Sequence, residues 1–244
     1  MRYFFRVEYD GAKFGGWQRQ NNAMSIQELL EKSFSTALRD NILITGAGRT
    51  DAGVHARAQG AHFDSESIGD LKKCELSVNA LLPPEIAIFG LKQVTDDFHA
   101  RYSAVSRRYR YYICQRKCPL YMKRVWMVFY DIDWELVRRN MTALEGTHDF
   151  ETFCASGSSA ETNICTVKNV SLDNESELWV FTIEADRFIY KMVRSLIGTL
   201  VDIGRGRIAE GLAEIISSRE RKRAGATAPP FGLVLDNVEY EGVQ

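Results

Sequence analysis

The sequence predicts an α+β fold of two lobes, with mainly antiparallel mixed sheets flanked by helices and a cleft between the lobes. Strand-like and helix-like runs follow one another irregularly in both halves, without the strict βαβ alternation of a parallel sheet. A length of 244 residues suits one large domain or two compact ones. We place the lobe boundary near residue 105, with an N-terminal lobe over 1–105 and a C-terminal lobe over 106–244.

The first half opens with the run YFFRVEY (3–9), whose aromatic and β-branched residues favour a strand. Asp10-Gly11 then marks a turn, and Ser25 can cap a helix over the residues that follow, where apolar side chains recur at helical spacing. Further along, the same criteria predict a strand over 41–45, a turn-rich segment over 46–53, a strand over 59–64, a helix over 71–82 stopped by Pro83-Pro84, and a strand over 85–94.

The second half opens with the strand-like run RRYRYYIC (107–114). Two segments flanking the polar turn 173–176 read as a β pair, and the segment 188–203 reads as a strongly apolar helix that ends near Gly204. The complete set of expected elements here is a strand over 107–114, a helix over 134–144, strands over 164–172 and 177–184, helices over 188–203 and 208–217, and a closing strand over 233–240.

Charge limits the function classes that remain. The net charge is −1 and the pI is near 6.5, which argues against a uniformly basic RNA-coating protein. The charge is locally uneven, because residues 101–124 contain eight Lys and Arg and no Asp or Glu. Tyrosines lie between these cations, so a surface made of this run can follow phosphates while its rings meet bases.

The five cysteines are odd in number and none forms a CxxC pair. We therefore expect reduced thiols in a cytoplasmic protein and no disulfide framework. The N-terminus lacks the apolar stretch of a signal peptide, and no uncharged run approaches 18 residues, so we expect no membrane span. The four histidines are scattered, and we expect no metal site.

The most informative segment is GAGRTDAGVHA (46–56), which brings three glycines, two ionisable side chains and a histidine into one short loop. Glycines permit tight turns and the close approach of a ligand. The loop lacks both the GxGxxG pattern of dinucleotide-binding proteins and the GxxxxGK[ST] pattern of the P-loop. An ordinary surface turn is the alternative interpretation of such a loop.

The motif GRTDAGVHA resembles the signature of the tRNA pseudouridine synthase A family. The resemblance extends over nearly the whole chain, because further segments match family motifs in order. These are YDG (9–11) with GWQRQ (16–20), DFHAR (97–101), RRYRY (107–111), Phe188 with MVR (192–194) and Gly198, and APPFGLVL (228–235). A pseudouridine synthase-like fold is therefore expected.

This resemblance implies that Asp51 is the catalytic nucleophile. The reaction breaks the N1–C1′ bond of uridine, rotates the uracil and rejoins it through C5. A carboxylate can attack C1′ or uracil C6, and the sequence does not choose between these routes. No redox step occurs, so no cofactor is expected.

The resemblance assigns two further catalytic residues. Arg194 matches the arginine that pairs with the aspartate, and a guanidinium can hold a carboxylate ionised through two hydrogen bonds. Tyr109 matches the active-site tyrosine, whose ring can stack on the uracil and whose hydroxyl can assist proton removal from C5. The alternatives are a snorkelling helix-surface arginine and a core aromatic of a strand.

Substrate binding is expected to be shared among several side chains. Arg49 matches the residue that helps hold the target nucleotide out of the stem. His55 can contact a phosphate or cap the loop, and the full expected set is Arg49, Thr50, His55, Arg107, Arg108 and Arg110. The implied substrate is the tRNA anticodon arm at positions 38 to 40, and the implied assembly is a homodimer.

Two other classes stay open at this stage. A non-catalytic tRNA-binding module or chaperone would use the basic surface alone, but RNA binding does not call for a carboxylate in the groove. A glycoside hydrolase would need a second acid near Asp51, and none lies close in sequence. Departures from the family pattern at Ser195 and over 119–127 leave the breadth of target uridines open, and the base that removes the C5 proton is also unassigned.

Overall fold

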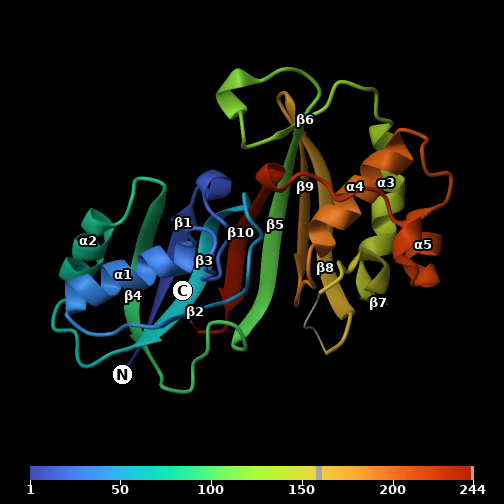
Figure 1. Ribbon diagram of the computed structural model, residues 1–244. Coiled ribbons are helices and arrows are strands. Elements are labelled where there is room, and N and C mark those ends of the chain that lie inside the picture. Colours follow the sequence, from blue (N-terminus) through green and yellow to red (C-terminus); the bar gives the residue numbers. More distant parts are fainter. Residues whose placement is uncertain (158–160, 243–244) are drawn as a thin grey trace. The chain divides into compact units, whose positions relative to one another are not determined.

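The computed structural model describes residues 1–157 and 161–242, and it confirms the predicted α+β class (Figure 1). Contacts between Cα atoms divide the chain into two compact units. Unit 1 comprises Met1–Val105 and Val234–Gln244, and unit 2 comprises Ser106–Leu233. The predicted C-terminal lobe ran to residue 244, whereas the last strand belongs to unit 1. The predicted roles of the two lobes stay predictions.

Unit 1 is a sheet with two helices on one face (Figure 1). The strand order is β4-β1-β3, and β2 and β10 both pair with β3. All of these pairs are antiparallel except β10 with β3, which is parallel. The elements are β1 (Arg2–Tyr9), the 3-10 turn η1 (Gly11–Lys13), α1 (Ile26–Leu38), β2 (Ile44–Gly46), β3 (His55–Asp64), α2 (Leu71–Leu81), β4 (Ile86–Val94) and β10 (Leu233–Tyr240).

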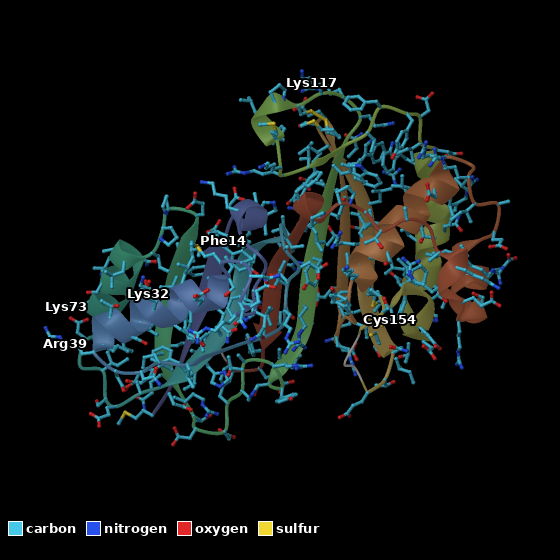
Figure 2. All side chains as sticks on the ribbon, viewed as in Figure 1. Phe14, Lys32, Arg39, Lys73, Lys117 and Cys154 are labelled. Carbon is cyan, nitrogen blue, oxygen red and sulfur yellow. A yellow bond between two sulfur atoms is a disulfide. The ribbon has the colours of Figure 1, made fainter. Side chains whose placement is uncertain are left out.

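The two helices form where the sequence supplies caps and an apolar face. The Ser25 hydroxyl accepts a hydrogen bond from the Glu28 N–H at 3.3 Å, and this cap starts α1 at the predicted residue. Phe34 of α1 packs against Phe5 and Phe63 of the sheet, with ring centroids 4.9 and 4.6 Å away. The polar side of the helices faces outward, as Lys32, Arg39 and Lys73 show (Figure 2).

The strands of unit 2 follow the order β5-β9-β8-β7 and pair antiparallel, and β6 pairs in parallel with β5. Its helices are α3 (Trp134–Met141), α4 (Met192–Gly204) and α5 (Leu212–Ser218). The strands are β5 (Ala104–Cys114), β6 (Trp126–Met127), β7 (Gly146–Asp149), β8 (Ile164–Glu175) and β9 (Leu178–Ala185). The short 3-10 turns are η2 (Pro119–Tyr121), η3 (Thr142–Leu144), η4 (Glu151–Phe153), η5 (Arg221–Arg223) and η6 (Pro230–Gly232).

Two predicted helices of unit 2 begin later than expected. The segment 188–203 was expected to be helical throughout, but α4 starts at Met192 because Lys191 has a left-handed backbone with φ 60°. The residues before it form the turn that precedes the helix. The helix expected over 208–217 likewise begins at Leu212, after the N-cap residue Gly211.

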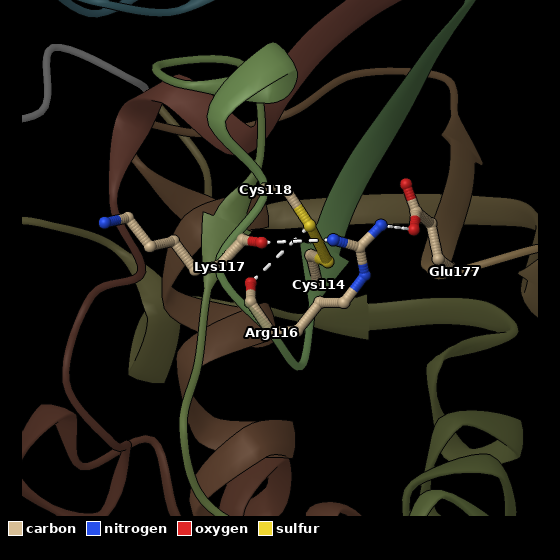
Figure 3. The surroundings of a disulfide bond; sticks show 5 residues. All are labelled: Cys114, Arg116, Lys117, Cys118 and Glu177. Carbon is tan, nitrogen blue, oxygen red and sulfur yellow. Dashed lines mark hydrogen bonds and ion pairs between the residues drawn. A yellow bond between two sulfur atoms is a disulfide. The ribbon is translucent and has the colours of Figure 1, made fainter.

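The expectation of reduced thiols is wrong for two of the five cysteines. The structure joins Cys114 and Cys118 in a disulfide (Figure 3). Cys114 ends β5, the chain then reverses, and both sulfurs become buried beside Val125. The two cysteines are four positions apart, so they do not form a CxxC pattern. The other three cysteines are free thiols.

Candidate active site

The Asp51 loop connects β2 to β3 in unit 1 and is tied to both strands. Ala47 N–H donates to the Gly60 carbonyl at 2.8 Å, where the β2–β3 ladder ends. Val54 N–H donates to the Asp51 carbonyl at 3.1 Å and closes a tight turn around the aspartate. Asp51 itself is half-buried. The loop therefore presents its carboxylate from a fixed backbone.

Thr50 anchors the residue before the aspartate. Its hydroxyl lies 2.8 Å from the Tyr9 hydroxyl in a buried hydrogen bond, and the Thr50 side chain is itself buried. The Thr50 carbonyl accepts a hydrogen bond from Trp17 N–H at 3.1 Å. Gly16 makes this approach possible, because its φ is +103° and a Cβ there would lie 2.6 Å from the Thr50 oxygen.

His55 connects the start of β3 to the turn after β1. Its Nδ1 accepts a hydrogen bond from Gly11 N–H at 3.1 Å, and an Asp10 carboxylate oxygen lies at the same distance from this nitrogen. Asp10 also accepts a hydrogen bond from Ala12 N–H and so caps η1. The His55 ring is buried, so the geometry supports a structural role, and a role in substrate binding stays a prediction.

Arg49 differs from its neighbours because its side chain is exposed. Within the described part of the chain, no hydrogen bond or ion pair holds its guanidinium. A long cation on a rigid loop next to a carboxylate is suited to a phosphate or to a displaced nucleotide.

Sequence reasoning missed two buried polar residues that support this loop. Gln59 is fully buried, and its amide nitrogen donates to the Gly48 carbonyl at 2.8 Å. Glu31 of α1 is buried, and its carboxylate accepts the Ile44 N–H at 3.0 Å and pairs with Arg19 at 2.6 Å. A glutamate on the apolar side of a predicted helix was the available signal, because buried charges require partners.

In unit 2, Tyr109 lies in the middle of β5, opposite Ile183 of β9. Its ring is half-buried and meets the Phe188 ring edge to face, with centroids 5.1 Å apart and planes at 87°. Phe188 lies in the segment between β9 and α4, so the packing places this segment beside the tyrosine. The ring is thus neither free nor locked in the core, and a half-buried aromatic can stack on a base.

Arg194 lies in the first turn of α4 and is half-buried. Its Nε donates to the Ala228 carbonyl at 2.8 Å, while Ala228 N–H donates to the Arg194 carbonyl at 3.0 Å. The first bond fixes the Arg194 side chain through its Nε, and the second joins the backbones of the two residues. Tyr111 lies within reach of this charge, which opposes the rise in the tyrosine's pKa that burial causes.

The three arginines predicted to bind substrate do not share one face of β5. Successive side chains of a strand alternate, so Arg107 lies on the face of Tyr109, and Arg108 and Arg110 lie on the other. Arg110 pairs with Glu175, and an Arg108 nitrogen lies 4.0 Å from Glu184. Beyond the strand, Lys117 projects from the loop between β5 and β6 (Figure 2). Carboxylates therefore partly neutralise the basic run, and the binding roles of these arginines stay predictions.

Residues 1–157 and 161–242 make up the described part of the chain. Over these residues, no three or more His, Cys, Asp or Glu side chains gather in a way that could hold a metal ion. None of the helices described is long and apolar enough to cross a membrane.

Comparison with known proteins gives consistent matches along the chain. The family model described as tRNA pseudouridine synthase matches residues 6–103 and 141–241. A tRNA pseudouridine synthase A from Bacteroides thetaiotaomicron is 41% identical over 244 residues, which cover 98% of this chain and 91% of that protein. The enzyme of the same name from Acetivibrio thermocellus is 42% identical over 237 residues, covering 96% of this chain and 97% of that one. By these matches, the chain belongs to the tRNA pseudouridine synthase family.

Proposed function

We propose that this protein isomerises uridine to pseudouridine in tRNA. The observation that carries the proposal is the identity of about 40% to proteins named tRNA pseudouridine synthase A over nearly the full length of both chains. The geometry of unit 1 supports it, because an aspartate stands on a loop that three strands and a helix hold in place. The substrate that the resemblance implies is the anticodon arm, at positions 38 to 40.

Asp51 is the proposed nucleophile. Its carboxylate attacks either C1′ of the ribose or C6 of the uracil, and in both routes the N1–C1′ bond breaks before C5 bonds to C1′. The bond between Asp51 and the nucleotide then breaks, which returns the free carboxylate. The C5 proton is lost in the last step. The half-buried position suits this role, since a carboxylate that is too deep cannot reach a nucleotide and one that is fully solvated is a weaker nucleophile.

Arg194 and Tyr109 take the other catalytic roles. The guanidinium of Arg194 holds the catalytic carboxylate ionised. The Ala228 carbonyl orients this guanidinium by accepting a hydrogen bond from its Nε. The Tyr109 ring stacks on the uracil, with Phe188 supporting it at its edge, and its hydroxyl assists removal of the C5 proton.

Recognition of the tRNA begins at Arg49. A uridine inside a stem must be extruded before an enzyme reaches it, and the exposed guanidinium beside Asp51 can occupy the space it leaves. Thr50, His55, Arg107, Arg108 and Arg110 complete the proposed binding set. We also propose that the protein works in the cytoplasm and that it forms a homodimer. The reason for the homodimer is that a chain with net charge −1 gains a longer basic surface by pairing.

The direct test is tritium release from tRNA labelled at uridine C5, followed by mapping of the pseudouridines. We expect release in proportion to enzyme turnover, with product at positions 38 to 40. Tight tRNA binding without any release from a mixed tRNA pool would contradict the proposal and would favour the non-catalytic binding module.

A further inference from the structure

An exposed pair of aromatic rings lies on unit 1 in the loop between β4 and β5. Tyr102 is 77% exposed, which is unusual for a large aromatic side chain. Its ring lies 4.5 Å from the His99 ring at 35° between their planes, and the Arg101 guanidinium lies 5.6 Å from its centroid. We call these three residues the Tyr102 platform.

Hydrogen bonds within the loop hold the backbone beneath the Tyr102 platform. His99 N–H donates to the Ser103 hydroxyl at 2.9 Å, and Ser103 N–H donates back to the His99 carbonyl at 2.8 Å. The ring nitrogen Nδ1 of His99 accepts the Arg101 N–H at 3.2 Å. Because these hydrogen bonds order the backbone of the turn, the turn itself places the Tyr102 side chain in solvent.

Buried contacts fasten the same loop to the sheet. Ala100 is fully buried, its N–H donates to Nδ1 of His62 at 3.1 Å, and its carbonyl accepts the Tyr240 hydroxyl at 2.7 Å. Gly60 lets Tyr240 reach this position, because a Cβ there would lie 2.1 Å from the tyrosine oxygen. The His62 and His99 rings meet at 4.8 Å and continue the ring contacts from the core to the surface.

The charge of the platform comes from Arg101. Burial and the charge of Arg2 lower the pKa of both His62 and His99, so these rings are neutral near pH 7. A rigid exposed ring flanked by one guanidinium matches the chemistry of an unpaired nucleobase with its phosphate. Sequence-tolerant stacking of this kind is a general mode of RNA recognition.

The platform lies away from the predicted site of chemistry. The Asp51 loop enters β3 at His55, and the platform packs on His62, seven residues along the strand. At about 3.3 Å per residue these points are roughly 23 Å apart. A base on Tyr102 is therefore a different base from the target uridine.

We propose that Tyr102 and Arg101 form a stacking platform for an unpaired tRNA nucleobase outside the target nucleotide. This inference rests on the proposed function, since tRNA is the RNA that the platform serves. The platform contributes to substrate affinity and leaves the chemical step unchanged.

The test compares Tyr102→Ala and Tyr102→Phe with the parent. Fluorescence anisotropy gives Kd for tRNA, and tritium release at saturating tRNA gives kcat. We expect Tyr102→Ala to raise Kd about 5- to 150-fold, the loss of one stacked base, with kcat unchanged. Tyr102→Phe keeps the ring and should bind within about twofold of the parent. The dependence of Kd on salt should keep its slope in Tyr102→Ala, because no phosphate contact is removed.

A matched control is Leu76→Ala, which removes a large side chain that is 64% exposed on α2. This variant should match the parent in Kd and kcat. An unchanged Kd in Tyr102→Ala, or a fall in kcat with unchanged Kd, would overturn the platform. If the parent releases no tritium, the proposed function fails, while the Kd values still decide whether the platform binds tRNA.

Discussion

Replacing Gly16 with alanine should disturb the Asp51 loop from a residue that lies outside it. Gly16 has φ +103°, a region that alanine disfavours. The added Cβ would lie 2.6 Å from the Thr50 carbonyl oxygen and 3.1 Å from the Ala52 nitrogen. Both contacts are backbone atoms on either side of Asp51, so neither can be relieved by rotating a side chain.

The size of the effect follows from these distances. Strain at a positive φ costs about 1–3 kcal/mol. Weakening the hydrogen bond from Trp17 N–H to the Thr50 carbonyl costs about 1 kcal/mol more. We therefore expect the free energy of unfolding to fall by about 2–4 kcal/mol. A contact of 2.6 Å is shorter than the 3.0 Å that Cβ atoms tolerate, so the Thr50 oxygen must move by about 0.4 Å or more. Since misplacement by about 1 Å can cost 100-fold, kcat should fall about 10- to 100-fold.

The assay is urea unfolding together with tritium release from C5-labelled tRNA. Gly69→Ala is the control, because a Cβ there meets no atom within 4 Å, and it should match the parent in both measurements. Gly48→Ala, on the Asp51 loop itself and equally open, should match the parent in stability. If Gly16→Ala were as stable and as active as Gly69→Ala, the view that this contact positions Asp51 would be refuted.

Two further predictions concern Arg194 and His62. Arg194→Lys should lower kcat about 10- to 100-fold, because an ammonium cannot both keep the hydrogen bond to Ala228 and present a planar fork to a carboxylate. Single-turnover rates near those of the parent would show that Arg194 has no part in the mechanism. Burial lowers the pKa of His62 from 6.5 to about 4, so the unfolded chain takes up this proton first as the pH falls. The contribution of His62 to the free energy of unfolding is therefore fully present above pH 6.5. It falls by up to about 3 kcal/mol as the pH is lowered towards 4. His62→Asn, which can still accept the Ala100 N–H, should flatten this pH dependence in urea unfolding, and an unchanged slope would contradict the assignment.

Local signals in the sequence were enough for much of the fold. Ser25 starts α1 where predicted, since a cap and an apolar period occur together there. The late start of α4 could not be predicted, because Lys191 adopts a left-handed backbone that its own conformational preference disfavours. The pairing of β10 with β3 could not be predicted either, because the two strands lie far apart in the sequence and no local pattern indicates their pairing.

The candidate site shows the same division. The motif around Asp51 was visible as a cluster of glycines and polar residues, and the structure gives it an anchored backbone. Tyr9 was visible only as part of a predicted strand and of the YDG motif, and Gln59 only as part of a predicted strand, so neither pattern showed that these side chains support the loop. The opposite faces of Tyr109 and Arg110 follow from strand alternation, which could have been applied to the sequence itself.

The central claim is that Asp51 is the nucleophile of a tRNA pseudouridine synthase. The most direct measurement compares the parent with Asp51→Ala in tritium release from C5-labelled tRNA, with tRNA affinity measured on the same preparations. The account predicts release by the parent and none by Asp51→Ala, with affinity largely preserved because binding depends on phosphates and shape. Release by Asp51→Ala at a rate near that of the parent would contradict it.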